Sequence, residues 1–130
     1  MLDNYDKTTI RVNGEPTNLV ARLATTPFRR MRGLLGQPDV PKKEVLLISP
    51  CSSIHCWFMR IPITVVYLSA VEPSHADRAT RTVLAVAEVR PWHLGFGPRG
   101  TRAVLECRAG TDVFSVGDRV EFVPVAASLA

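Results

Sequence analysis

Short runs of apolar residues, separated by turn-forming residues, alternate along most of the chain and predict β-strands rather than helices. Near the start, residues 8–12 and 17–23 are strand-like, and Asn13-Gly14 between them is a strong signal for a two-residue hairpin turn. Further strands are predicted at residues 45–48, 54–59, 63–68, 82–89, 103–107 and 119–123. The run 82–89 is almost continuously apolar, which favours a central strand.

Three segments interrupt this strand pattern. Thr26 as N-cap and Pro27 at the first helical position precede apolar residues at helical spacing, so we expect one short helix near residues 27–35. Residues 72–81 are mostly polar and are expected to form an exposed loop. Residues 91–100 contain two prolines and three glycines, which predicts irregular structure.

Seven or eight short strands and one helix predict a mainly β protein, either a β-sandwich of jelly-roll type or a partly closed barrel. The chain has 130 residues and is 46% hydrophobic, which suits one domain over residues 1–130 with a core at about 8–123. We find no alternation of strands with helices, no internal repeat and no linker.

Charge and hydropathy narrow the range of partners. No window approaches the roughly 20 apolar residues of a membrane span, and the first twenty residues lack the apolar stretch of a signal peptide, so a cytoplasmic location is expected. The net charge is +4, and the positive residues are mostly arginines spread among acidic residues. This pattern favours a solvated basic surface over nucleic-acid binding, and leaves a small molecule or a protein as the partner.

Residues 51–60 hold the densest group of chemically active side chains. Because side chains alternate along a strand, His55, Trp57 and Met59 share one face and Arg60 lies on the other. The sequence predicts a ligand pocket beside this strand, walled by Trp57, Met59 and Trp92.

Charged residues complete this predicted site. Glu106 interrupts an apolar strand, and a half-buried charge needs compensation, so Arg60 is its natural partner. Arg30, Arg32 and Arg60 are expected to face an anion or to act structurally, because the arginine fork suits carboxylate and phosphate groups.

The leading hypothesis is a non-catalytic binding or accessory module without a metal or cofactor. The chain has neither a glycine-rich phosphate loop nor a Gly-x-Ser-x-Gly nucleophile motif, and its three cysteines are too few and odd in number for a closed disulfide framework. The alternative is a small hydrolase or metal-dependent enzyme that uses His55, Cys51 or Cys107, and Glu106.

Five segments in the same order resemble one known family. The run 54–68 (IHCWFMRIPITVVYL) is similar to the central signature of domain-of-unknown-function family 192, and residues 26–36 (TPFRRMRGLLG) resemble its early arginine-glycine-leucine motif. The remaining matches are 89–92 (VRPW), 103–106 (AVLE) and Gly117-Asp118. The resemblance implies a β-rich domain of sandwich or jelly-roll type and implies no activity.

The chain departs from the pattern of that family at three positions. Thr64 stands where the family usually carries an aspartate, Gln37 where an arginine usually follows the helix, and Ser69 where an acid typically closes the next strand. If the aspartate serves chemistry elsewhere in the family, this chain lacks it. If it only holds a turn, the hydroxyl of Thr64 is able to replace it.

Overall fold

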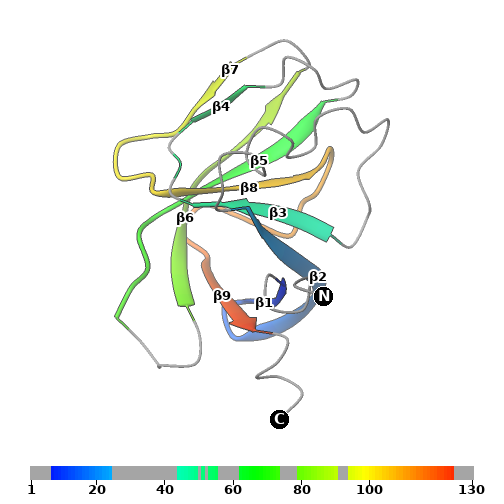
Figure 1. The fold of residues 1–130 in the computed structure, drawn as a ribbon, viewed down its shortest axis with the longest axis vertical. Helices are drawn as coiled ribbons and strands as arrows, with labels where there is room; N and C mark the ends of the chain where they lie inside the picture. Colours follow the sequence, from blue (N-terminus) through cyan, green and yellow to red (C-terminus); the bar gives the residue numbers. More distant parts are fainter. Residues whose placement is uncertain are drawn as a thin grey trace.

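A computed structural model describes residues 7–24, 44–49, 51, 53–55, 62–73, 79–90 and 94–124. In this part of the chain nine strands follow one another (Figure 1): β1 (Lys7–Val12), β2 (Glu15–Ala24), β3 (Glu44–Ile48), β4 (Ser53–His55), β5 (Ile63–Leu68), β6 (Ala79–Val89), β7 (Leu94–Phe96), β8 (Ala103–Arg108) and β9 (Arg119–Pro124). The helix expected near residues 27–35 lies outside the described residues. In the described ranges no helix is long and apolar enough to cross a membrane.

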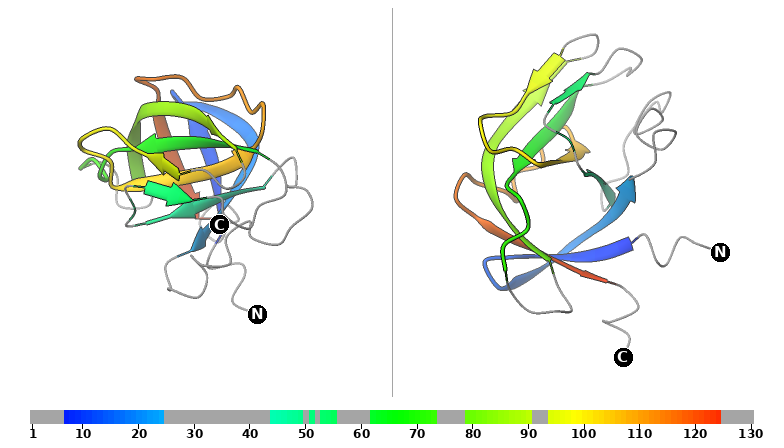
Figure 2. Two further views of the ribbon diagram at one scale, coloured as in Figure 1. Left: turned by 90° about the horizontal axis from the view of Figure 1, so that it is seen from above. Right: turned by 60° about the vertical axis from the view of Figure 1, so that its left-hand side comes forward.

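Seven of these strands form a closed barrel in the order β1-β2-β3-β8-β5-β6-β9, and β1 closes the ring by pairing with β9 (Figure 2). Neighbouring strands are antiparallel except β2 and β3, which are parallel. The prediction of a mainly β protein is confirmed. Of the two architectures left open by the sequence, the structure has the barrel, and it is fully closed.

The hairpin between β1 and β2 turns where the sequence predicts. Asn13 and Gly14 both have positive φ, 51° and 84°, which is the conformation a two-residue hairpin of type I′ requires. The Asn13 side chain also joins the turn to the start of β9: its Oδ1 accepts a hydrogen bond from the backbone N–H of Arg119 at 2.9 Å.

The barrel interior holds the main apolar core. Inward-facing residues from opposite sides of the ring meet there, among them Ile10, Val66, Leu105, Val120 and Phe122. All six residues of β5 are buried, so this strand packs on both of its faces. Its outward residues Ile63, Val65 and Tyr67 form a second cluster with Val89 and Val104 on the outside of the barrel.

Two segments differ from the predicted loops. β6 begins at Ala79, so Thr80 and Arg81 belong to a strand instead of an exposed loop, because they pair with Glu121 and Val120 of β9. Leu94–Phe96 forms β7 within the segment predicted to be irregular, because it pairs with β4. Both corrections depend on partners distant in the sequence.

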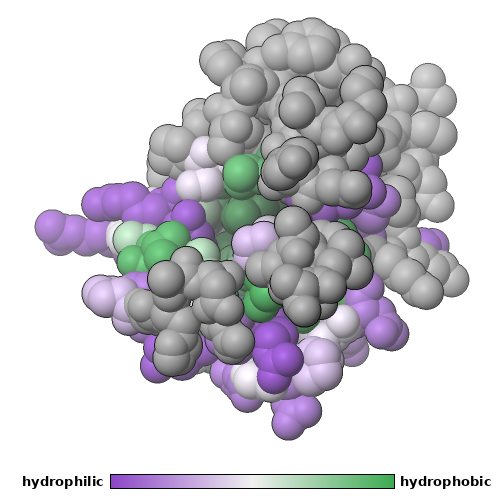
Figure 3. Space-filling model, turned by 60° about the horizontal axis from the view of Figure 1, so that its bottom comes forward, coloured by the Kyte–Doolittle hydropathy of each residue, from purple (hydrophilic) through white to green (hydrophobic). Residues whose placement is uncertain are grey.

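Large exposed hydrophobic side chains among the described residues come from three places: Val71 after β5, Phe96 in β7, and Val113 and Val116 between β8 and β9. Figure 3 shows the bottom of the molecule, where the coloured residues are mostly hydrophilic and the hydrophobic ones form small separate groups. On this face, the described residues present no broad apolar surface.

Candidate functional site

A two-stranded ribbon stands apart from the barrel. β4 and β7 pair antiparallel, with Ser53 opposite Phe96 and His55 opposite Leu94, and they lie at the top of Figure 1. Phe96 is 71% exposed, which is unusual for so large an apolar side chain. The ribbon therefore carries the start of the predicted site segment on a strand outside the barrel.

The base of the ribbon is attached to the outer apolar cluster. Cys51, two residues before β4, packs against this cluster, and its backbone N–H donates to the carbonyl of Arg102 at 2.9 Å. Gly97, directly after β7, lies against Tyr67 and Thr101 so closely that an added Cβ would be 2.6 Å from the Tyr67 ring and 2.5 Å from Thr101 Oγ1. Both strands of the ribbon are thus anchored beside Tyr67.

Glu106 lies on the same outer face of the sheet. In the registers of β8 it stands opposite Val65 of β5 and Leu46 of β3, two residues along from Val104 of the outer cluster. Glu106 is only 8% exposed. A carboxylate at such a position needs compensating polar partners, because transfer of a charge out of water is costly.

Among the predicted site residues, the structure describes the side chain of Glu106 and the backbone of His55 in β4. The others, Trp57, Met59, Arg60, Trp92, Arg30 and Arg32, lie outside the described residues. The described part brings the outer cluster, the base of β4 and Glu106 to one face of the barrel.

Cys107 is separated from this face. It follows Glu106 in β8, so its side chain points the opposite way, into the barrel, and it is 0% exposed. Burial, and after it the negative charges of Glu106 and Glu88, raise the pKa of the Cys107 thiol far above its usual range. Cys107 thus lies buried on the opposite face of β8 from Glu106, which disfavours the part of the alternative enzyme hypothesis that combines these two residues.

Cys51 is the other described thiol, and it is partly exposed. No group of three or more His, Cys, Asp or Glu side chains able to hold a metal occurs among the described residues.

Thr64 takes over a structural task at the position where the resembling family usually has an aspartate. Its hydroxyl donates a hydrogen bond to Glu88 on β6 and accepts one from the backbone N–H of Gly110 at 3.1 Å. Thr64 is 1% exposed, and Gly110 belongs to the turn that follows β8. The hydroxyl thus holds that turn, as the second reading of the substitution supposed.

Arg81 is the described residue that the sequence interpretation missed most clearly. The sequence predicts an exposed loop at this position, yet Arg81 is 9% exposed and lies on the inner face of β6. The alternation of Arg81 with Val83, which lies in the core, is the one signal in the sequence that points to this orientation.

The fold and the site together define a small closed β-barrel with an external two-stranded ribbon and a buried carboxylate at the ribbon's side. The chain belongs to the DUF192 family, described as "Uncharacterized ACR", which matches residues 8–122. No curated protein matches the chain.

Two solved structures share the fold. One is from Sinorhizobium meliloti and is described as a "putative transcription regulator"; it has a TM-score of 0.72 and 21% identity, over 91% of this chain and 95% of that one. The other is a protein of unknown function from Novosphingobium aromaticivorans, with a TM-score of 0.66 and 21% identity over 86% of this chain and 82% of that one. At this identity the likeness concerns the fold.

Proposed function

We propose that this protein is a non-catalytic binding module whose ligand site lies beside β4, on the outer face of the barrel. The observation that carries the proposal is the position of Glu106, a carboxylate that is 8% exposed and lies beside the apolar cluster on the outer face. A buried charge of this kind is costly for stability alone, and such groups concentrate where a protein binds something.

The proposed site combines an apolar wall with charged groups. His55, Trp57, Met59 and Trp92 form the wall, because they belong to β4 and its continuation or to the segment before β7. Arg60 compensates Glu106, and Arg30 and Arg32 face an anionic part of the ligand. Aromatic walls with a few placed polar groups are typical of small-molecule sites.

A second candidate is an enzyme that uses Cys51. The observation in its favour is that the partly exposed Cys51 packs against the same outer cluster as the residues around Glu106. It requires a thiol of lowered pKa, which reacts with alkylating reagents at neutral pH much faster than an ordinary cysteine. Ordinary reactivity of Cys51 excludes this candidate and leaves the binding module.

Native mass spectrometry of the untagged protein, compared with Glu106→Gln and Glu44→Gln, tests the binding role. Glu44 is the matched control, because it lies on the neighbouring strand β3 with a side chain that is 44% exposed. We expect a mass excess from a co-purified small molecule in the wild type and in Glu44→Gln, and its loss in Glu106→Gln.

A melting-temperature screen with amines, amino acids, carboxylates and nucleotides accompanies this measurement. A bare mass for the wild type together with no saturable shift in the screen overturns the binding role. Equal retention of the bound molecule in both variants removes Glu106 from the site.

A further inference from the structure

Arg81 lies on the inner face of β6, near one end of the barrel. It stands opposite Val120 in the β6–β9 register and two residues before Val83, and both of these residues belong to the interior core. Its exposed fraction is 9%. An arginine is rarely so deeply buried without a partner of opposite charge.

The two hydrogen bonds from the Arg81 side chain go to neutral oxygen atoms. Nη1 donates to the carbonyl oxygen of Ser69 at 2.8 Å, and Nη2 donates to the hydroxyl of Ser49 at 3.2 Å. Ser69 directly follows β5 and Ser49 directly follows β3. The guanidinium thus joins three strands at the end of the barrel where β3 and β5 finish.

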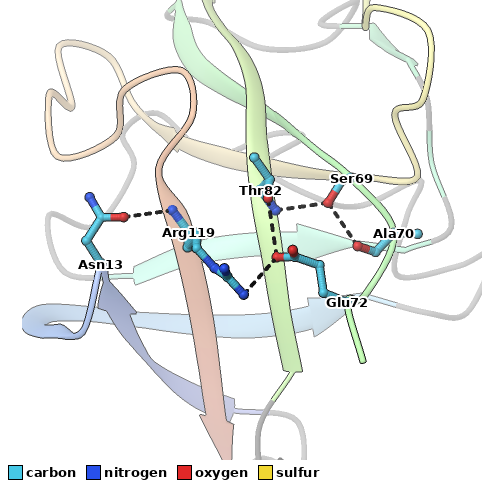
Figure 4. A network of polar contacts seen from close by, with 6 residues as sticks. All are labelled: Asn13, Ser69, Ala70, Glu72, Thr82 and Arg119. Atoms are coloured by element: carbon cyan, nitrogen blue, oxygen red, sulfur yellow. Dashed lines mark hydrogen bonds and ion pairs between the residues drawn. The ribbon is translucent and has the colours of Figure 1, made fainter. Parts of the chain in front are cut away.

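Ser69 is held firmly for this contact (Figure 4). Its backbone N–H donates to the carbonyl of Thr82 at 3.0 Å, and its Oγ accepts from the backbone N–H of Thr82 at 2.9 Å and donates to the carbonyl of Ala70 at 2.9 Å. The carboxylate of Glu72 accepts a hydrogen bond from the Thr82 hydroxyl at 3.3 Å and forms an ion pair with Arg119 at 3.5 Å. The carbonyl that receives Arg81 therefore belongs to a preorganised framework.

No carboxylate lies within ion-pair distance of Arg81 in the described ranges. The nearby acids are engaged elsewhere: Glu72 pairs with Arg119, and Glu121 of β9 pairs with Arg11. Glu88 accepts a hydrogen bond from Thr64 at the opposite end of β5. Desolvation by burial lowers the pKa of the Arg81 guanidinium from its usual value. The guanidinium is thus partly withdrawn from water, and its hydrogen bonds within the described residues go to neutral oxygen atoms.

We propose that this end of the barrel is an anion site, in which Arg81 and the Ser49 hydroxyl bind a carboxylate group of a small molecule or a peptide. Ser49 Oγ accepts from Arg81, so its own hydrogen remains able to donate to the same anion. One buried cation balances one negative charge, which favours a carboxylate monoanion over a phosphate dianion.

This site is distinct from the one proposed beside Glu106. Arg81 faces the barrel interior, whereas Glu106 lies on the outer face of β8. The failure of either proposal therefore leaves the other intact.

Thermal unfolding at constant ionic strength tests this anion site. Acetate and inorganic phosphate are the probes, and chloride is the reference salt. We expect acetate to raise the melting temperature of the wild type saturably, by about 5 °C at about ten times its Kd. Arg81→Met, which keeps the length and loses the charge, is expected to lose this shift. Arg102→Met is the matched control, because Arg102 is exposed at the same end of the barrel and is expected to keep the shift.

A further variant covers the case in which Arg81→Met fails to fold. Ser49→Ala leaves the guanidinium in place and is expected to weaken acetate binding about tenfold, the usual effect of losing one hydrogen bond to a charged group. The absence of a saturable acetate shift in the wild type, or an equal shift in Arg81→Met or Ser49→Ala, overturns the site. A phosphate shift as large as that of acetate overturns the assignment to a carboxylate and shows a general anion site. Where acetate alone gives the expected shift, a larger shift from a peptide ending in a free carboxylate than from its amidated form, each added without acetate, identifies a peptide as the source.

Discussion

Adjacent residues of β8 occupy two different chemical environments, although the sequence sets them side by side. Glu106 faces the outer layer near the ribbon, and Cys107 faces the core of the barrel. Successive side chains of a strand point to opposite faces, so Glu106 is directed to the outer face and Cys107 to the interior. The two side chains therefore point away from each other, which disfavours direct proton transfer between them.

Cys107 is expected to resist alkylation as long as the protein is folded. Its thiol is fully buried and its pKa is raised by burial, so iodoacetamide must wait for an unfolding event. Peptide mapping after a timed reaction should show labelling at least about a hundredfold slower than in the urea-unfolded chain. Cys51, which is partly exposed, is the internal control. Labelling of both thiols at one rate in the folded protein contradicts the burial of Cys107.

The Cys107 thiol is expected to lower the free energy of unfolding at alkaline pH. Because the folded state raises the pKa of Cys107, its proton is held in the folded protein and released from the unfolded chain once the pH exceeds the ordinary thiol value of about 8.5. Stability is therefore fully present below that pH and falls above it, by up to about 1.4 kcal/mol per pH unit. Urea unfolding of the wild type and of Cys107→Ala between neutral and alkaline pH should show this extra slope only in the wild type. Parallel curves for the two proteins would remove Cys107 as its source.

At the scale of elements, the ribbon depends on close packing at its base. The backbone of Gly97 passes directly over Tyr67 and Thr101, and this contact attaches the end of β7 to the outer apolar cluster. A two-stranded sheet is only marginally stable by itself, so this attachment is what holds β4 beside the barrel.

Gly97→Ala is expected to destabilise the protein by about 1–3 kcal/mol, because the added Cβ overlaps the Tyr67 ring and Thr101 Oγ1. Gly110→Ala is the matched control: nothing lies within 4 Å of its added Cβ, and its φ of 84° predicts a loss of about 1 kcal/mol from backbone strain alone. Thermal unfolding compares the two variants. A Gly97→Ala protein that melts with the wild type shows that the ribbon is attached differently.

The elements that the sequence predicts well are those whose signals are local. Asn13-Gly14 predicts the β1–β2 hairpin, and a run of apolar residues predicts β5. The structure contains both elements. β7 and the first residues of β6 were missed because their strand character comes from pairing with β4 and β9, which lie far away in the chain. For the same reason, the sequence does not predict the burial of Arg81. The oxygens that accept its hydrogen bonds belong to Ser49 and Ser69, which follow other strands, β3 and β5, and lie at a distance from Arg81 in the sequence.

At the scale of the whole molecule, the ring is closed by the two most distant strands. Thr8 stands opposite Pro124 and Val12 opposite Val120, so β1 and β9 bring the two ends of the described chain together. The proposed anion site depends on this closure, because β9 also holds the start of β6, where Arg81 projects inward. Contacts of such high sequence separation slow folding, because the entropy of loop closure must be lost before they form.

Removal of β9 is therefore expected to unfold the whole barrel, not only to remove one strand from it. A chain that ends at Asp118 loses the β9 partner of both β1 and β6, which leaves two open edges and removes Phe122 from its position opposite the core residue Ile10. A chain that ends at Pro124 keeps all nine described strands and is the matched control. We expect the control to unfold in one cooperative transition near the wild-type temperature, while the shorter chain shows no such transition by circular dichroism or calorimetry. A cooperative transition of the shorter chain at the wild-type temperature would mean that the barrel is held by β2, β3, β5 and β8 without closure, and that the interior position of Arg81 has another cause.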